Sequence, residues 1–343
     1  MRINIKKNNL NSSLDKINTF IQSNNNLSSI IDYCREYKSK NEIKIYLVGG
    51  IIRDIILDSK YSFFDLDLII DGNIDHFAKN FSEDLNCRIN KIHNFPNYKL
   101  FFNDDLEIDI AHARSEQYKS PGSLPVWKKS TINDDLFRRD FSINSVAVEI
   151  HSDFLKIIDP INGIEDIENE IIKVLHNNSF SDDPTRIYRA IRYRSRLQFD
   201  FDKNTKLLFY DSIKDLNNLS IFRKNKEILK FLEEENIENF LSIKGKDSIV
   251  DSLFPKNFLN KLSFVDKNFW KKSNIKEKIF FAFFSVENQT RNDFLNSMNF
   301  SKNDMKEISL FFEIKEIVEN NNLQNPEDLS LDKDFISNLY HCL

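Results

Sequence analysis

The segment IYLVGGIIRDIILDSKYSFFDLDLII, residues 45–70, combines two features that are unusual in a chain of this composition. Gly49 and Gly50 stand side by side after an apolar run, although the 343 residues include only 6 glycines. Asp65 and Asp67 then lie one residue apart in a second apolar run. The pattern predicts a strand, a helical turn and a second strand, so the glycines end one strand and the acids lie in the next.

The two aspartates point to metal-dependent chemistry. Alternation along a strand sends residues i and i+2 to the same face, so Asp65 and Asp67 project together. Two such carboxylates repel, and one takes up a proton unless a cation lies between them. A pair of Mg²⁺ ions about 4 Å apart is the usual solution in phosphoryl transfer, because Mg²⁺ prefers carboxylate, water and phosphate oxygens. The alternative is a pair of acids that caps a turn.

Neighbouring residues fit a nucleotide site, although each also has a simpler explanation. Gly49 and Gly50 let a backbone approach a triphosphate closely, or they form a tight turn. Arg53 is placed to meet phosphate oxygens, or it makes a surface ion pair. Asp109, with Glu107 in the predicted strand LEIDIAHA, completes the carboxylate cluster or pairs with a core arginine. A P-loop is excluded because no GK[ST] follows, and a Rossmann site is disfavoured because GxGxxG is absent.

A first arginine block, with Arg138, Arg139, Asp140 and Asn144, is predicted on one short helix whose N-cap is Asn133. These polar groups in an otherwise apolar element indicate either an inward-facing polar site or a solvated helix start.

A second arginine block follows in DDPTRIYRAIRYRSRLQF, where Pro184 is predicted in the first turn of a helix. Guanidinium groups bind triphosphates bidentately, and a neighbouring Asp–Arg pair can recognise the edge of a base. The alternative is an exposed basic helix. Four arginines fall within an arc of about 120° on this helix: Arg186, Arg189, Arg192 and Arg196.

The rest of the pattern predicts an α+β head followed by helices. Residues 1–40 form a polar lead-in with a helix near LSSIIDYCREY. Strands are predicted over EIKIYLV, FFDLDLII, YKLFFN and LEIDIAHA, with a helix over NIDHFAKNFSEDL. A Pro/Gly loop is predicted at 115–132, and two short strands, FLKIIDP and EIIKVLH, flank a turn at Gly163. After about residue 178 the strand signals stop and amphipathic helices follow.

Composition sets limits on the partners. A net charge of -5 restricts any nucleic-acid surface to a local basic patch. The 3 cysteines form no CxxC pair, so we expect neither a zinc site nor a disulfide framework, and a reducing cytoplasm fits best. No apolar run reaches the roughly 20 residues of a membrane span.

Four motifs in order, LVGGIIRD…DLD, IDIAHARSEQY, RRDFSINSVA and DDPTRIYRAIRYRSRLQF, resemble the bacterial class II tRNA nucleotidyltransferase and poly(A) polymerase family over about residues 43–202. The resemblance implies a polymerase-beta-like nucleotidyltransferase head, with a small mixed sheet and flanking helices, followed by an all-helical neck and body. We divide the chain accordingly into a lead-in at 1–40, a head at 41–178, a neck at 179–240 and a diverged RNA-binding body at 241–343.

The resemblance assigns roles by motif. Asp65 and Asp67 are the expected Mg²⁺ ligands and catalytic carboxylates, and we add Asp109 as a candidate catalytic acid. Asp183 and Arg186 are expected to select C or A without a template. The family usually has Glu at the position of Asp182, which changes the positioning of this pair. The expected nucleotide-binding residues are Gly49, Gly50, Arg53, Arg139, Asp183, Arg186, Arg189 and Arg192.

The implied activity is addition of C and/or A to the 3′ end of tRNA from CTP and ATP, with release of pyrophosphate. Poly(A) polymerase, CC-only and A-only tRNA enzymes remain open alternatives. So do a catalytically idle RNA-binding protein on the same scaffold and a small-molecule nucleotidyltransferase. We expect a cytoplasmic protein whose partner is tRNA, with no membrane and no DNA.

Overall fold

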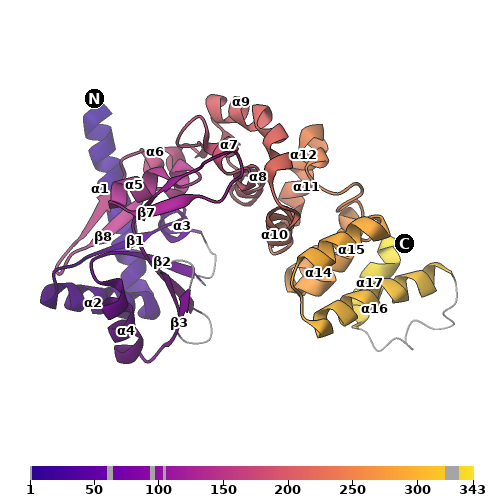
Figure 1. The fold of residues 1–343 in the computed structure, drawn as a ribbon, viewed down its shortest axis with the longest axis horizontal. Helices are drawn as coiled ribbons and strands as arrows, with labels where there is room; N and C mark the ends of the chain where they lie inside the picture. Colours follow the sequence, from indigo (N-terminus) through magenta and orange to yellow (C-terminus); the bar gives the residue numbers. More distant parts are fainter. Residues whose placement is uncertain (1, 60–64, 93–96, 103–105, 321–331) are drawn as a thin grey trace. The chain divides into compact units, whose positions relative to one another are not determined.

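The computed structural model describes residues 2–59, 65–92, 97–102, 106–320 and 332–343 (Figure 1). The chain packs into two units. The first contains Met1–Asp183 and Asp200–Ser212, and the second contains Pro184–Phe199 and Ile213–Leu343. The four predicted domains are a different division, and they stay a proposal.

A seven-stranded mixed sheet forms the centre of the first unit, in the order β3-β4-β5-β2-β1-β8-β9. β2 and β5 run parallel, whereas the other neighbours are antiparallel. The strands of this sheet are β1 (Lys44–Val48), β2 (Asp65–Asp71), β3 (Arg88–Ile92), β4 (Asn97–Phe102), β5 (Leu106–His112), β8 (Ala147–Ile150) and β9 (Leu155–Ile158). Two smaller pairs are β6 (Arg114–Gln117) with β7 (Val126–Lys129), and β10 (Ile171–Ile172) with β11 (Asp200–Phe201).

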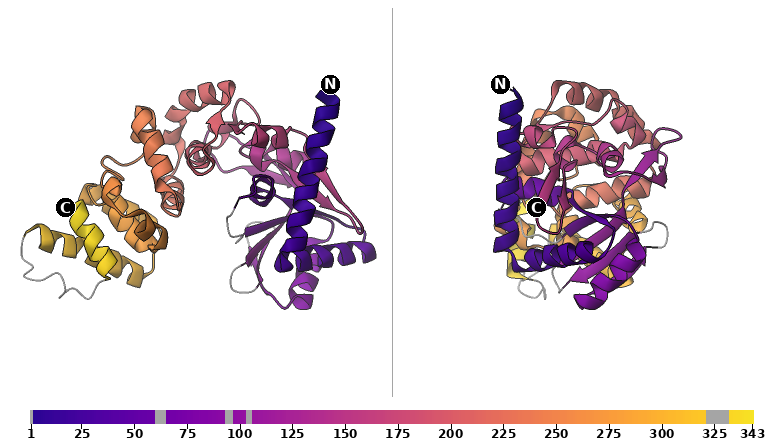
Figure 2. Two further views of the ribbon diagram at one scale, coloured as in Figure 1. Left: turned by 180° about the vertical axis from the view of Figure 1, so that it is seen from behind. Right: turned by 90° about the vertical axis from the view of Figure 1, so that its left-hand side faces the viewer.

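Helices surround the sheet of the first unit. α2 packs against β1 and β8, and α4 packs against β3 and β5 (Figure 1). The long helix α1, drawn in indigo in Figure 2, packs against α2, α3, α6 and β9. The helices are α1 (Arg2–Ser23), α2 (Asn25–Lys40), α3 (Gly50–Ile56), α4 (Ile74–Asp84), α5 (Ile132–Phe137), α6 (Gly163–Glu168), α7 (Ser179–Asp182) and α9 (Lys203–Asp211), with a 3₁₀ turn η1 (Ser142–Asn144).

Both faces of the central strands are buried, but one face of β2 changes from polar to apolar along the strand. Leu66 and Leu68 on β2 are buried on one face. On the other face Ile69 joins an apolar cluster with Val48 of β1 and Leu136 of α5. Asp67 lies on that same face, because it is two residues from Ile69. Asp67 therefore lies beside the apolar cluster of Ile69, Val48 and Leu136, which packs α5 on the sheet.

The second unit is helical throughout its described residues. α8 packs against α10 and α11, and the Tyr188 hydroxyl donates a hydrogen bond of 2.9 Å to the Leu253 carbonyl. The elements are α8 (Thr185–Leu197), η2 (Ile213–Asn218), α10 (Ile221–Leu232), α11 (Ile237–Lys246), α12 (Ser248–Ser252), η3 (Leu262–Phe264), α13 (Lys267–Lys272), α14 (Ile275–Ala282), α15 (Asn288–Ser297), α16 (Lys302–Glu319) and α17 (Lys333–Cys342). The predicted class, an α+β head with a mixed sheet followed by a helical body, is confirmed.

Several local predictions were wrong. The lead-in contains α1 in addition to the predicted helix α2. The predicted loop at 115–132 includes most of a β-ribbon, because β6 and β7 pair from Arg114↔Lys129 to Gln117↔Val126. β3 and β8 were not predicted, and the pair β10–β11 places a strand after residue 178. Phe63, Phe64 and Asn103 of the predicted strands lie outside the described residues.

The first arginine block is not a single helix. The N-cap of α5 is Thr131 rather than Asn133, because the Thr131 hydroxyl accepts the Asp134 N–H while the Asp134 carboxylate accepts the Thr131 N–H. The helix ends at Phe137, and Asn144 lies in η1.

The predicted turn at Gly163 is instead the start of α6. The Asp159 carboxylate accepts the N–H groups of Gly163 and Ile164 at 2.7 and 3.0 Å. A Cβ on Gly163 would lie 2.3 Å from the Ser142 carbonyl oxygen, so only glycine allows this helix to approach η1 so closely.

Candidate active site

The sheet register brings the acids of β2 and β5 together. Asp65 lies opposite Glu107, and Asp67 lies opposite Asp109 in the parallel pair. Cross-strand partners share a face, so four carboxylates gather at one end of the two strands. Lys99 of β4 is the cross-strand partner of Asp109, and its ammonium forms an ion pair with Glu107 and lies 3.8 Å from Asp109 Oδ1.

The backbone conformation and the close neighbours of Gly49 require glycine at the end of β1. Its φ is +88°, a conformation that other residues rarely adopt. A Cβ at this position would lie 2.6 Å from Asp67 Oδ2 and 3.6 Å from Arg139 Nη1. The missing side chain therefore makes room for the Asp67 carboxylate, and the predicted approach of a triphosphate to Gly49 stays a prediction. The same geometry places Arg139 next to Asp67.

Arg53, on α3, is buried, and its three nitrogens all donate. Nε and Nη2 donate to the two oxygens of Asp54 at 2.8 and 2.9 Å, and Nη1 donates to Asn144 Oδ1 at 2.5 Å. Its side chain is only 2% exposed. A surface ion pair is thereby excluded, and Arg53 fixes η1 to α3. Asn144 in turn donates to Asp140 Oδ1 at 3.0 Å.

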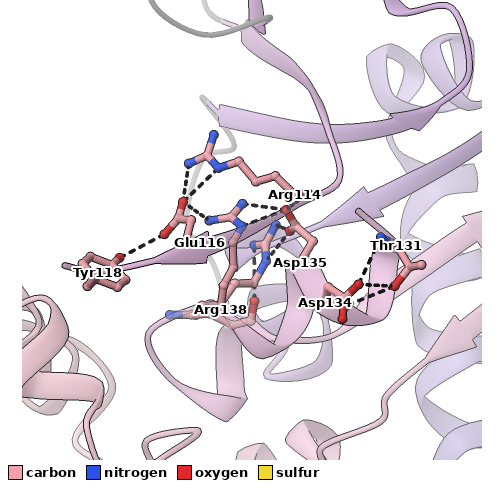
Figure 3. Close-up of polar contacts among 9 residues, drawn as sticks. Arg114, Glu116, Tyr118, Thr131, Asp134, Asp135 and Arg138 are labelled. Atoms are coloured by element: carbon pink, nitrogen blue, oxygen red, sulfur yellow. Dashed lines mark hydrogen bonds and ion pairs between the residues drawn. The ribbon is translucent and has the colours of Figure 1, made fainter. Parts of the chain in front are cut away.

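Arg139 follows α5 and is held by a buried acid on that helix. Its Nε and Nη2 donate to Asp135 Oδ2 at 3.2 and 3.1 Å, and Nη1 donates to the Asn144 carbonyl at 3.4 Å. Asp135 also accepts from Arg138, which reaches Glu116 on β6 (Figure 3). The two arginines of the RRDF motif therefore share one carboxylate.

Burial shifts the proton affinity of the acids. Burial raises the pKa of Asp67; the positive charge of Arg139 opposes this rise and Asp65 adds to it. Burial, opposed by Lys99 and reinforced by Asp67 and Asp65, raises the pKa of Asp109 to about 6. A cation placed among these side chains would favour their charged forms.

Comparison with known proteins finds a family match within the first unit. Residues 45–173 match the model of the poly A polymerase head domain, and this range contains the paired acids, Gly49 and Arg139. These residues of the first unit are therefore similar to a poly A polymerase head domain. The resemblance of the motifs to the tRNA nucleotidyltransferase and poly(A) polymerase family is thereby confirmed.

Two curated relatives and one solved structure extend this comparison. The A-adding tRNA nucleotidyltransferase of Geobacter sulfurreducens is 35% identical over 60% of this chain, but the chain spans only 23% of that protein's length. The CCA-adding enzyme of Francisella tularensis subsp. novicida is 29% identical, over 85% of this chain and 78% of its own. A solved apo CCA-adding enzyme superposes with a TM-score of 0.70 at 26% identity, covering 95% of this chain and 82% of its own.

The acids of β2 and β5 are the candidate metal ligands of the first unit. Among the residues that the structure describes, no three His, Cys, Asp or Glu side chains are grouped to hold a metal ion. The donor set nevertheless fits Mg²⁺, because Asp65 and Asp67 offer carboxylate oxygens and buried Asp109 Oδ1 has no hydrogen-bond partner among the described residues. Mg²⁺ commonly takes only one or two protein carboxylates and completes its shell with water and phosphate.

The second arginine block spans both units. Asp183 ends the first segment of the first unit, and Arg186, Arg189 and Arg192 belong to α8 in the second unit. Arg186 and Arg192 are buried, so this is not an exposed basic helix. Arg192 lies 3.7 Å from Glu227 and 3.6 Å from Glu234, and Arg189 donates to the Tyr193 hydroxyl at 3.4 Å. The predicted roles of these residues in nucleotide selection stay predictions.

Three residues of the first unit support the candidate site but received no role of their own from the sequence. Asp135 accepts a hydrogen bond from Arg139, and Asn144 accepts one from Arg53. Lys99 forms an ion pair with Glu107 of β5. Asn144 was available from the RRDFSIN motif. Asp135 looked like one of two ordinary acids in a first helical turn, and only its burial distinguishes it.

None of the helices in the described part of the chain has both the length and the apolar character needed to cross a membrane.

Proposed function

We propose that this protein is a template-independent RNA nucleotidyltransferase that adds C and A to the 3′ end of tRNA from CTP and ATP. One observation carries the proposal: Asp67, with Asp65 two residues away on the same face, lies against Gly49 and beside Arg139 in a poly A polymerase head domain. The matched relatives that are named for adding A or CCA to tRNA support the same substrate.

The head domain supplies the groups that such a reaction needs. Asp65 and Asp67 would hold Mg²⁺, which when bound lowers the pKa of the attacking 3′-hydroxyl and neutralises charge at the α-phosphate. Arg139 directs one side of its guanidinium toward Asp67, where a triphosphate oxygen would lie. Gly50 and Arg53 remain proposed nucleotide contacts, and Asp109 a proposed catalytic acid.

Selection of C or A is proposed for the second arginine block. Asp183 and Arg186 offer an acceptor and donors that can match the edge of a base. Arg189 and Arg192 would contact the same nucleotide. The three thiols, which are free and buried, are compatible with the cytoplasmic location that we propose.

An A-only enzyme is the second candidate. The Geobacter relative, at 35% identity, carries an A-adding name, whereas the relative named for CCA addition aligns with more of this chain. A-only addition predicts incorporation of ATP on tRNA that ends in CC and no incorporation of CTP on any end.

The deciding experiment offers each labelled nucleoside triphosphate to tRNA lacking CCA, to tRNA lacking the final A, and to an unrelated RNA, with Mg²⁺. We expect CTP on the first tRNA and ATP on the second. A-tailing of the unrelated RNA would instead support poly(A) polymerase, and no incorporation with retained RNA binding would support an idle RNA-binding protein.

Matched variants test whether Asp65 and Asp67 are needed for nucleotide incorporation. Asp65→Asn and Asp67→Asn should each lower incorporation at least about 100-fold, because charge stabilisation of the transition state is lost. Asp71→Asn is the control, since Asp71 lies on the same strand and face but at its other end. Normal incorporation by either of the first two variants would refute the proposed site.

A further inference from the structure

We infer that Asp135 is a positioning residue for nucleotide binding, acting through Arg139 and linking that arginine to the β6–β7 ribbon. This inference rests on the proposed function of the same site. Asp135 does not touch the predicted position of the substrate, and its effect depends on the guanidinium that it holds.

Both oxygens of Asp135 are fully used. Oδ2 accepts from Nε and Nη2 of Arg139 at 3.2 and 3.1 Å. Oδ1 accepts from Nε and Nη2 of Arg138 at 2.9 and 2.7 Å, and from the backbone N–H of Arg114 at 3.2 Å. The carboxylate is 0% exposed. Burial alone would raise the pKa of Asp135, but Arg139 and Arg138 outweigh it and hold this pKa below its ordinary value.

These bonds orient Arg139. A guanidinium presents its donors in a planar fork, so two bonds along one edge fix the direction of the remaining edge. With Nε and Nη2 on Asp135, Nη1 is left on the side of Asn144 and Gly49. That is the side on which Asp67 lies. Without Asp135, Arg139 would keep its charge but lose this direction.

The same carboxylate ties the base of the ribbon to the site. Arg114 is the first residue of β6, and its side chain pairs with Glu116 at 2.8 Å. Glu116 also accepts from Arg138 at 3.2 Å and from the Tyr118 hydroxyl at 2.9 Å (Figure 3). Asp135 therefore connects the β6–β7 ribbon and Arg139 through side chains that are mostly buried.

Helix stability does not explain Asp135. The N-terminus of α5 is already capped by Thr131 and Asp134, which form a capping box. Burying a carboxylate with two guanidinium groups costs desolvation and is weak evidence for stability. The neighbouring acid thus provides a matched control: Asp134 is on the same helix, is exposed, and caps it.

The test measures ATP affinity and activity separately. Asp135→Asn keeps the shape but removes the charge, so Arg139 keeps at most part of its fork contact. We expect the dissociation constant of Mg²⁺–ATP, by calorimetry, and the KM for ATP to rise about 10-fold or more, with a smaller change in kcat. Asp134→Asn should leave both constants unchanged and affect only the melting temperature.

Double variants separate positioning from general damage. Asp135→Asn combined with Arg139→Gln should be no worse than the poorer single variant, since both remove one interaction. A wild-type dissociation constant for Asp135→Asn, or full multiplication of the two defects, would overturn the inference.

Arg139→Lys keeps the charge without the fork, so it tests the same idea if Asp135→Asn does not fold. It should raise the ATP dissociation constant, whereas Arg138→Lys should not. Wild-type affinity in Arg139→Lys overturns the inference. If the wild-type protein binds ATP but extends no RNA, the proposed function fails and the dissociation constants still decide the role of Asp135. If it binds neither ATP nor CTP, both fail.

Discussion

At the scale of single residues, Gly49 sets the distance between the β1–α3 turn and the Asp67 carboxylate. We predict that Gly49→Ala destabilises the fold by about 1–3 kcal/mol, because alanine is strained at a positive φ and its Cβ displaces Asp67. RNA extension should fall at least about 10-fold. Gly50→Ala is the control for stability alone, since its Cβ would meet only the end of the Arg53 side chain, at 3.2 Å. Urea unfolding measures the loss of stability and initial rates measure RNA extension by Gly49→Ala. Equal losses of stability in the two variants would contradict this account.

Asp109 gives a pH-dependent prediction. Its pKa of about 6 in the folded protein lies above the ordinary 3.8, mainly because of burial, so between these values the folded state keeps a proton that the unfolded chain has released. Its contribution to stability is therefore present at low pH and is lost as the pH rises through about 6. Asp109→Asn should accordingly raise the melting temperature relative to wild type at pH 8, and by less at pH 4.5.

These melts belong in EDTA, because a divalent cation would stabilise the charged carboxylate. If Asp109→Asn melted below the wild-type protein at pH 8, the charged form of Asp109 would be stabilising the fold, with Lys99 as its partner.

The sequence predicts residues well where the relevant geometry is local. Asp65 and Asp67 share a face because strand alternation requires it. The role of Gly49 was assigned to a triphosphate because the position of Asp67 against it depends on the pairing of β1 with β2. Asp135 could not be distinguished from Asp134, since the backbone N–H of Arg114, which also bonds to its carboxylate, is 21 residues away.

At the scale of elements, ion pairs hold α8 to the connection between α10 and α11. Glu234 accepts from Arg196 at 2.8 and 2.5 Å and lies 3.6 Å from Arg192, and its side chain is only 9% exposed. Glu234→Gln leaves two arginines without their shared anion, so we predict a loss of about 3 kcal/mol in the free energy of unfolding. Glu238→Gln is the control, because Glu238 pairs with exposed Lys267 and should change stability by less than about 1 kcal/mol.

Denaturant unfolding measures the free energy of unfolding of Glu234→Gln and Glu238→Gln. Comparable losses from both would mean that burial does not strengthen the contact of Glu234.

Several elements with strong periodicity or clear caps were predicted, whereas two polar strands were not. α4 begins after Asn73, which caps it, and its apolar side chains recur at helical spacing. The strands β6 and β7 read RSEQ and VWKK, which lack the alternation of a half-buried strand, so they looked like a loop. β11 has only two residues and depends on its partner β10, so no local pattern could reveal it.

At the scale of the whole molecule, α8 belongs to the second unit although residues 200–212 return to the first. The fragment 184–343 should therefore unfold cooperatively, whereas 213–343 should not, because it lacks the helix that packs on α10 and α11. Far-ultraviolet circular dichroism during heating measures this. Equal melting of the two fragments would show that α8 is dispensable for the second unit.

The sequence predicted a change from mixed structure to helices near residue 178, and β11 (Asp200–Phe201) is the exception among the described residues after that point. It could not predict that the chain crosses between the units more than once, because the crossing depends on which helices bury Ile187 and Tyr188 of α8. Apolar periodicity shows that a helix has a buried face, but not which neighbour covers it.

The chain passes from one unit to the other at 183–184, 199–200 and 212–213, so three covalent links join them. A gene fusion that exchanges the first unit for that of a relative cannot use a single crossover point. The transferred part must include residues 200–212 together with residues 1–183. The helix α8 must stay with α10 and α11, on which it packs. Evolution by shuffling is restricted in the same way, which favours gradual divergence of the two halves in place.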